Sequence, residues 1–161
     1  MTYQSVTTAH QRRTRGALAA GAVLLTAACG GEQRLSKSAY EQHVQAAYAQ
    51  VRAAFRETAN APSLEDLAAR VATAQAALRK ASHEVALLRA PKNAAGPNAD
   101  LAEALRAYAD DLDELRRAAA AGDTRVVRRF ESGNRESIDR IERAAEELAA
   151  RGYRLGALAP G

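Results

Sequence analysis

The chain has 161 residues, a length that suits one compact domain. Although 47% of its residues are hydrophobic, aromatic residues supply only 4% and Trp is absent, which favours closely packed helices over sheets. Three of the 23 Lys and Arg residues precede Cys29, and all 19 acidic residues follow it. The formal net charge, +4 for the whole chain, is therefore only +1 from Cys29 onwards, which argues against nucleic-acid binding.

The N-terminal segment has the layout of an export signal. Residues 11–16 (QRRTRG) are basic, and residues 17–28 (ALAAGAVLLTAA) form an uncharged, mostly apolar run that ends in small side chains. A helix of this length extends about 18 Å, well short of the roughly 30 Å hydrocarbon core of a bilayer. The pattern therefore predicts a signal peptide that is removed on export, and not a permanent transmembrane helix.

The end of this apolar run resembles a bacterial lipobox. Residues 25–29 (LTAAC) place small side chains before Cys29, and Gly30 and Gly31 follow, although Thr26 stands where that family usually has leucine. The resemblance implies that the Cys29 thiol is diacylglycerylated and that signal peptidase II cuts before it. It also implies a lipid anchor in a cell membrane, with the protein on the extracytoplasmic side. The alternative is an ordinary secretory signal followed by a free cysteine.

The lipobox divides the chain into three predicted parts. They are a signal peptide at residues 1–28, the lipidated cysteine with a flexible tether at 29–37, and a helical domain at 38–161. The single cysteine excludes a disulfide within the chain, so packing alone must hold this domain together.

Two helices with continuous apolar stripes open the domain. The first is predicted to begin at a capping box of Ser38 and Glu41. The second is predicted to run from Ser63, with Asp66 in the reciprocal capping position, to Pro91. Both stripes have the three-to-four spacing of a helix face: Tyr40, Val44, Ala47, Tyr48, Val51 and Phe55, and then Leu64, Leu67, Val71, Ala74, Leu78, Ala81, Val85 and Leu88.

A third helix follows a predicted loop. Residues 92–99 (KNAAGPNA) are rich in loop-forming types, and Asp100 with Glu103 forms another capping box directly after them. Gly122 is expected to end the helix as its C-terminal cap. The apolar stripe is Leu101, Leu105, Tyr108, Leu112 and Leu115.

A fourth helix is predicted between an Asp123 cap and Gly152. Gly133 and Asn134 interrupt its middle, so the helix is either bent or split in two. We expect the tail at residues 153–161 to fold back over the end of the bundle. The apolar residues of this helix are Val127, Phe130, Ile138, Ile141, Ala145 and Leu148.

Four amphipathic helices with short or moderate connections predict an all-α fold, an antiparallel up-down-up-down four-helix bundle. The similar helix lengths favour this bundle over a three-helix arrangement with an independent first helix. The prolines and glycines fall at the turns, which favours the compact form over an extended coiled coil.

The sequence holds no recognisable catalytic constellation. Antiparallel pairing brings His43 and His83 to a similar height, but His83 falls between the stripe residues Ala81 and Val85, which predicts a surface position and no metal site. Glu-x-x-His pairs, G-x-S-x-G, S-x-x-K and glycine-rich phosphate loops do not occur. We therefore expect no cofactor and no enzymatic activity.

Arginines gather towards the end of the bundle opposite the start of the first helix. Arg125, Arg128 and Arg129 lie in the first turns of the fourth helix, where the macrodipole disfavours cations, and Arg116 and Arg117 end the third helix. The cluster predicts binding of an anionic cell-wall polymer or of an acidic face of an envelope protein. Alternatively, nearby acidic residues neutralise it; they are Glu57, Glu65, Asp66 and Asp123.

The domain resembles small helical lipoproteins, rich in Ala and Arg, of high-GC actinobacteria. The resemblance covers Tyr40 to Gly152 and is carried by LLRAP at residues 87–91, by the periodic helices and by RGY at 151–153. It implies a helical fold and an envelope location, and that group has no agreed activity to carry over. We expect a non-enzymatic binding or adaptor module; the alternative is a carrier that holds a small apolar ligand or a metal inside the bundle.

Overall fold

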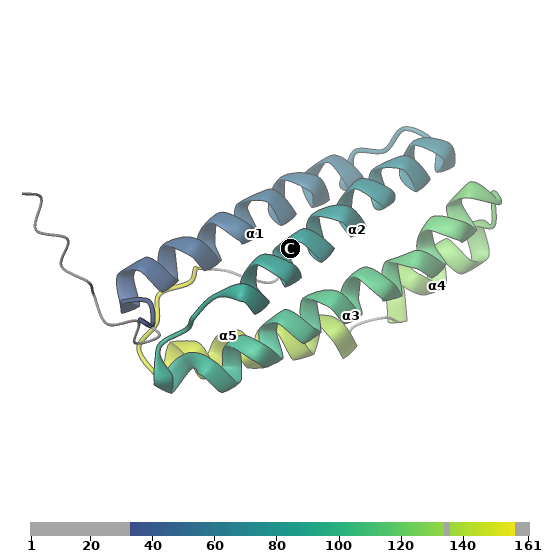
Figure 1. The fold of residues 1–161 in the computed structure, drawn as a ribbon. Coiled ribbons are helices and arrows are strands. Elements are labelled where there is room, and N and C mark those ends of the chain that lie inside the picture. The colour runs from purple at the N-terminus through teal and green to yellow at the C-terminus, as the bar shows by residue number, and fades with distance from the viewer. Residues whose placement is uncertain (1–32, 134–135, 157–161) are drawn as a thin grey trace, which may run out of the picture. The chain divides into compact units, whose positions relative to one another are not determined.

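The computed structural model describes residues 33–133 and 136–156; the predicted signal peptide and Cys29 lie outside them. Within these ranges the chain is helical and contains no strand, which confirms the predicted all-α class. In chain order the elements are α1 (Lys37–Ala59), α2 (Leu64–Leu87), a 3-10 turn η1 (Lys92–Ala94), α3 (Ala95–Ala120), α4 (Thr124–Gly133) and α5 (Glu136–Ala150) (Figure 1).

The helices pack as an antiparallel bundle. Helix α1 packs against α2, α2 against α3, and α3 against both α4 and α5 (Figure 1). The predicted fourth helix is divided, because α4 ends at Gly133 and α5 begins at Glu136. We call the end where α1 begins and α2 ends the near end, and the end that carries the α1–α2 turn the far end.

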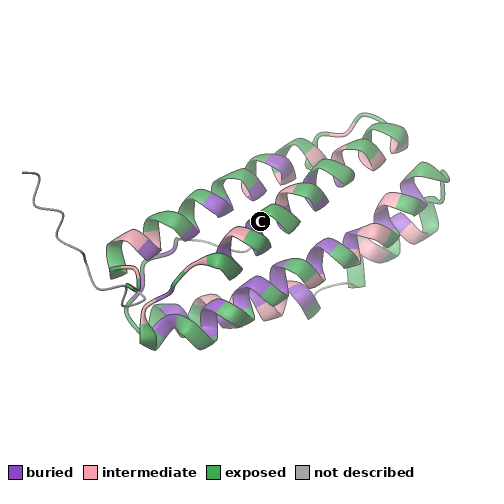
Figure 2. Cartoon of the chain, in the orientation of Figure 1, coloured by how far each residue is buried: buried purple, intermediate pink, exposed green. Residues whose placement is uncertain are grey.

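The predicted apolar stripes form one continuous core, and buried positions lie along the inner faces of the helices in Figure 2. Tyr40 and Tyr48 of α1 are 0% and 1% exposed. Between α2 and α3 the buried positions include the alanines Ala74, Ala81 and Ala102, whose small side chains allow the two helix backbones to approach closely. Burial of these stripes is the main source of stability in a bundle.

Several predicted helix boundaries are confirmed by their hydrogen bonds. Ser63 precedes α2, and its hydroxyl accepts from the Asp66 amide at 3.1 Å. The Asp123 carboxylate accepts from the Arg125 amide at 3.0 Å at the start of α4. Gly122, at φ 71°, and Gly152, at φ 86°, adopt the left-handed conformation that ends a helix with little strain for glycine alone.

The predicted N-cap of the first helix was wrong by two residues. Ser36 and not Ser38 is the N-cap of α1, and its hydroxyl accepts from the Ala39 amide at 3.2 Å. Ser38 already lies inside the helix and is exposed. Glu41 stands three residues after Ser38 and completes the capping-box pattern, whereas Ala39, three residues after Ser36, has no reciprocating side chain, so the pattern favoured the wrong serine.

The predicted loop at residues 92–99 was also wrong. A short 3-10 turn leads directly into α3 at Ala95, so Asp100 and Glu103 lie within the helix, exposed, and do not cap it. Pro97 is in the first turn of α3, where backbone N–H groups have no intrahelical acceptor and proline is therefore tolerated. Loop-forming composition here marks a helix start.

The tail folds back over the near end, as predicted, for the residues that the structure describes. Tyr153 is buried and its hydroxyl donates to Asn93 Oδ1 at 2.7 Å. The Arg154 amide donates to Glu41 Oε1 at 2.8 Å, which ties the tail to α1. In residues 33–133 and 136–156, every helix is too short or too polar to cross a bilayer.

Candidate functional site

The main candidate site is a cavity of about 860 Å³ between the last turns of α2 and the first turns of α3, which we call the α2–α3 cavity. Arg34, from the segment before α1, and residues 88–90, from the α2–α3 connection, complete its wall. Along α3 the lining of the cavity runs from Ala95 to Asp110, roughly 22 Å at 1.5 Å per helical residue. It is long enough for an elongated small molecule.

Alanines form the apolar part of the α2–α3 cavity wall, between the charged and polar residues of the lining. Ala86 comes from α2, and Ala95, Ala99 and Ala102 come from the first turns of α3. Leu88 adds a half-buried apolar side chain at the near-end edge. These alanines and Leu88 offer an apolar body a contact surface, and polar side chains such as Ser82 and His83 lie beside it.

Buried polar side chains connect α2 and α3 along this interface. Ser82 Oγ donates to the Ala102 carbonyl at 2.7 Å, and Asn98 Nδ2 donates to the Val85 carbonyl at 3.0 Å. The Val85 carbonyl, in the last turn of α2, also accepts from the Leu88 amide at 3.1 Å, so the second bond adds a donor at the end of this helix. Asn98 is 5% exposed, and its Oδ1 has no hydrogen-bond donor among the described residues. Asn98 therefore carries a buried acceptor that no described residue satisfies.

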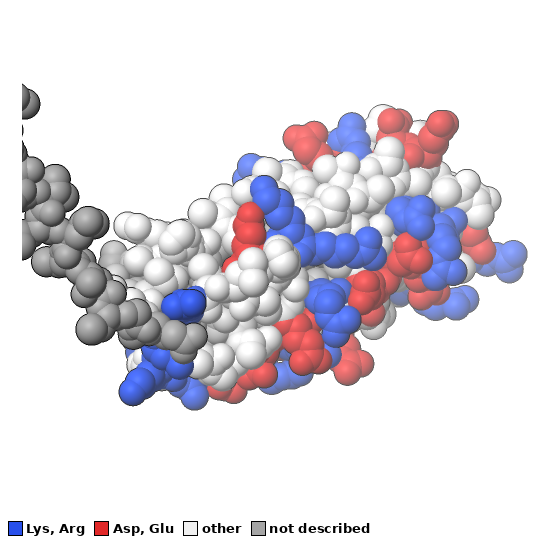
Figure 3. All heavy atoms as spheres, viewed as in Figure 1, with Lys and Arg blue, Asp and Glu red and all other residues white. Residues whose placement is uncertain are grey.

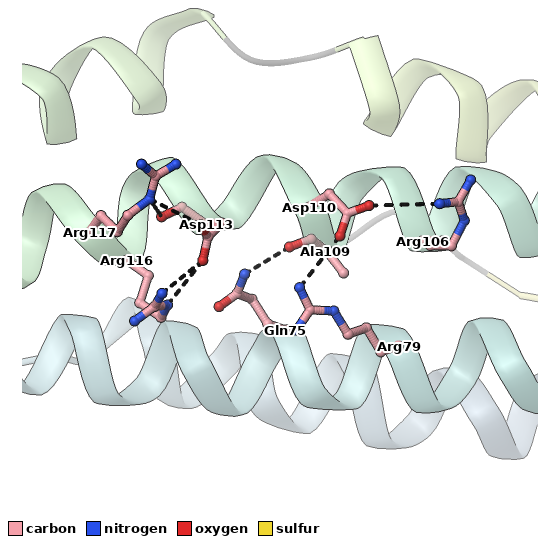
Figure 4. A network of polar contacts seen from close by, with 8 residues as sticks. All are labelled: Gln75, Arg79, Arg106, Ala109, Asp110, Asp113, Arg116 and Arg117. Atoms are coloured by element: carbon pink, nitrogen blue, oxygen red, sulfur yellow. Dashed lines mark hydrogen bonds and ion pairs between the residues drawn. The ribbon is translucent and has the colours of Figure 1, made fainter.

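Two carboxylates line the α2–α3 cavity, and arginines pair with both. Asp110 lies 3.4 Å from Arg79 Nη2 and 4.0 Å from Arg106 Nη1, as Figure 4 shows. Glu103 accepts from Arg140 Nη2 at 2.8 Å, and this hydrogen bond with the charge of Arg140 lowers the pKa of Glu103. Such exposed pairs add little stability, but they compensate the negative charge of the lining.

Two further arginines at the near-end edge have no carboxylate partner among the described residues. Arg34 Nη1 donates to the Ala90 carbonyl at 2.9 Å, which fixes the guanidinium at the mouth of the cavity. Arg89 is exposed, and its backbone carbonyl accepts a hydrogen bond from the Leu35 amide at 2.8 Å. The edge of the cavity near Arg34 and Arg89 therefore carries uncompensated positive charge, which attracts an anion.

The arginines that the sequence singled out lie elsewhere, at the far end. Arg116 Nη2 and Arg117 Nε lie 2.8 Å and 3.0 Å from the carboxylate oxygens of Asp113 (Figure 4). The hydrogen bond from Arg116 lowers the pKa of Asp113. Arg125, Arg128 and Arg129 are exposed on α4. Two of the five predicted anion-binding residues thus share one carboxylate, and the three on α4 have no carboxylate partner among residues 33–133 and 136–156.

Neither histidine of the described chain is placed for metal binding. His43 and His83 are exposed, and His83 lies at the rim of the α2–α3 cavity. Within residues 33–133 and 136–156, no three His, Cys, Asp or Glu side chains converge in a way that would hold a metal ion.

A second cavity of about 660 Å³ opens at the far end, and we call it the far-end cavity. Phe55 and Tyr108 lie in its wall with their rings stacked at a centroid distance of 5.6 Å. Its lining has no charged residue, and its other large apolar side chains are Leu64, Leu67, Leu112, Leu115, Phe130 and Ile138. This cavity suits a neutral, apolar molecule.

Sequence reasoning missed the α2–α3 cavity because it assigned the first turn of α3 to a loop. The signal that was available in the sequence is Asn98 at the end of a Gly-Pro-Asn string, which starts a helix as readily as a turn.

Comparisons with known protein families, with curated proteins and with solved structures find no match to this chain. The fold and site define a helical bundle with one basic and one apolar cavity.

Proposed function

We propose that the protein is an extracytoplasmic lipoprotein, anchored through lipid on Cys29, that binds an anionic small molecule in the α2–α3 cavity without transforming it. The observation that carries the proposal is the charge arrangement of the cavity. Arginines already pair with both lining carboxylates, whereas Arg34 and Arg89 have no carboxylate partner among the described residues. An anion supplies the missing negative charge.

The shape of the cavity specifies the ligand further. The arginines lie at its near-end edge, and the alanines Ala86, Ala99 and Ala102 extend away from them along α2 and α3. A molecule with a compact anionic head and an apolar body matches both parts, because the head reaches the guanidinium groups while the body covers the alanines.

A pair of dyes with the same ring system tests this chemistry. Anilinonaphthalene sulfonate carries an anionic group, and phenylnaphthylamine is its neutral counterpart. We expect calorimetric titration of the full chain to show tighter binding of the sulfonate. Ala86→Trp should abolish that binding, because Ala86 is exposed in the cavity wall and an indole fills the space. Arg89→Gln should weaken it about tenfold, the loss of one charge-assisted hydrogen bond.

Matched variants separate the cavity from general surface effects. Ala72→Trp adds the same indole at an exposed position of α2 outside the cavity, and Arg125→Gln removes one exposed charge at the far end. Both should bind the sulfonate like the original chain. If Arg125→Gln weakens binding and Arg89→Gln does not, the far-end arginine cluster is the anion site and the proposal is wrong.

The far-end cavity favours a second candidate function, that of a carrier for a small apolar molecule. Its lining is uncharged and includes the stacked Phe55 and Tyr108 rings. In this case phenylnaphthylamine binds at least as tightly as the sulfonate. Ala59→Trp, at an exposed position in the wall of the far-end cavity, then abolishes binding, and Ala53→Trp, exposed on the same helix outside the wall, leaves it unchanged.

The lipid anchor has its own test. Cells that express the chain with labelled palmitate should incorporate the label, and the chain should sediment with membranes. Cys29→Ala should lose both properties. Label and membrane association that persist in Cys29→Ala would contradict anchoring through this residue.

A further inference from the structure

Three separate segments form the surface of the near end: residues 33–37, 87–95 and 150–156. The Leu35 amide donates to the Arg89 carbonyl at 2.8 Å, which joins the first segment to the second. The Tyr153 hydroxyl donates to Asn93 at 2.7 Å, which joins the third to the second. The three segments therefore make one continuous, ordered surface at this end of the bundle (Figure 1).

This surface is strongly basic. Its three segments contain no Asp or Glu, and blue Lys and Arg atoms gather at this end of the bundle in Figure 3. The far end differs, because there Arg and Lys atoms lie beside Asp and Glu atoms (Figure 3). The cations of the near-end surface are Arg34, Lys37, Arg89, Lys92, Arg151 and Arg154.

Among the described residues, two carboxylates bond to these segments, Glu147 and Glu41, and Glu41 accepts from the Arg154 amide at 2.8 Å, so positive charge remains in excess. Arg151 pairs with Glu147 at 3.0 Å, and Lys37 Nζ lies 5.8 Å from the centre of the Tyr153 ring. Helices α1 and α3 start at this end, and neither has an acidic residue in its first turn, in contrast to α2 and α5. The positive ends of two helix macrodipoles therefore add to the side-chain charges.

The near end also displays an apolar side chain. Leu87, the last residue of α2, is 69% exposed and is the one large hydrophobic residue with such exposure among the described ranges. It precedes Arg89 and Lys92 in the same segment. An exposed leucine among cations is the arrangement by which peripheral proteins bind a charged lipid surface, since the apolar group enters the headgroup region while the cations contact phosphates.

The start of the described chain lies at this surface. Gln33 is four residues after Cys29, and a fully extended chain of that length reaches at most about 14 Å. We infer that the near end binds the anionic headgroups of the bilayer that holds the anchor, with Leu87 entering the headgroup region. The inference rests on the lipid anchor proposed above.

A thiol-reactive fluorescent probe tests the inference on the full, lipidated chain. Lipid on Cys29 leaves a cysteine introduced at Leu87→Cys as the free thiol, and Ala120→Cys places the same probe at an exposed site in the last turn of α3, at the far end. The labelled proteins are reconstituted in vesicles of phosphatidylcholine, with or without 30% phosphatidylglycerol. We expect the emission of the probe at position 87 to shift to the blue in the anionic vesicles only, and the emission at position 120 to stay unchanged.

Charge variants test the electrostatic part of the inference. Lys92→Gln with Arg154→Gln removes two cations that do not line the α2–α3 cavity. Each cation near an anionic surface strengthens binding to that surface about fivefold. Removal of two cations should therefore weaken binding of the near end to the anionic headgroups about 25-fold. Salt should weaken it further. Arg125→Gln with Arg128→Gln removes two exposed cations at the far end and should have no effect.

Two results would overturn the inference. One is an emission of the probe at position 87 that is the same in neutral and anionic vesicles, and the other is an equal shift in emission at positions 87 and 120. The intact mass of the purified chain keeps this result separate from the proposed function. If the mass shows no lipid on Cys29, the anchor is refuted. Flotation of the unlipidated chain with the same vesicles then decides the inference, since binding to the anionic vesicles alone supports it and equal recovery in both refutes it.

Discussion

Replacement of Tyr48 by Phe is expected to make the protein more stable. Tyr48 is 1% exposed, and its hydroxyl has no hydrogen-bond partner among the described residues. A buried hydroxyl without a partner costs about 1–3 kcal/mol of desolvation, which Tyr48→Phe recovers while the ring stays packed. The void left by the oxygen, roughly 10–15 Å³ at about 24 cal/mol per Å³, costs only about 0.3 kcal/mol.

The expected gain in the free energy of unfolding is therefore about 1–2 kcal/mol for Tyr48→Phe. It should appear in urea titrations followed by circular dichroism at an unchanged slope, and as a rise in the melting temperature of about 3–6 °C. Tyr153→Phe is the matched comparison, because it removes a hydroxyl that donates to Asn93, and it should destabilise the protein by about 1 kcal/mol.

The same reasoning applies to Tyr40, whose buried hydroxyl is also unpartnered. The two tyrosines are two turns apart on α1, so the effects of Tyr40→Phe and Tyr48→Phe should add to within about 0.5 kcal/mol. A loss of stability in Tyr48→Phe of more than about 0.5 kcal/mol would refute the argument, because it would mean that a buried water or a ligand satisfies this hydroxyl.

Three further predictions concern alkaline pH, a glycine and caps. Burial raises the pKa of Tyr108 to about 12, so the stability that its neutral phenol contributes is complete below pH 10 and is lost as the pH rises towards 12. Tyrosinate absorbance should therefore rise together with the loss of helical circular dichroism. Ionisation of Tyr108 near pH 10 in a chain that remains folded would contradict this prediction. Gly122→Ala should destabilise the protein by about 1 kcal/mol because of its positive φ, and an unchanged melting temperature would refute this. Ser36→Ala should cost about 1 kcal/mol in urea titrations and Ser38→Ala less than about 0.5 kcal/mol, and the reverse order would restore Ser38 as the cap.

The sequence was sufficient to predict the elements that depend on local periodicity. The stripe of α2 and the caps at Ser63 and Asp123 are found where the pattern placed them, because each needs only residues within one or two turns. The split between α4 and α5 falls at Gly133, where a glycine interrupts the stripe. These features follow from local backbone preference.

The features that depend on tertiary contact could not be predicted in this way. Residues 92–99 have loop composition, but the Asn98 side chain donates to the end of α2, and this contact favours a helical start. The α2–α3 cavity combines Arg34 with side chains about 45 to 76 positions away in the chain. Charge clustering in the sequence instead pointed to Arg116 and Arg117, which the fold pairs with Asp113.

The hydrogen bonds between α2 and α3 also determine the register of the bundle. The buried faces of these helices combine large side chains such as Leu78 and Leu105 with alanines, and a small alanine side chain resists sliding of one helix along the other less than a leucine does. Gln75, Ser82 and Asn98 each donate to one carbonyl of the facing helix, Ala109, Ala102 and Val85 respectively. A slipped arrangement would leave these buried donors unsatisfied, at about 1–3 kcal/mol each. Two amide groups and one hydroxyl group thus favour one alignment of α2 on α3, and they do so in addition to the packing of the large apolar side chains of the same core.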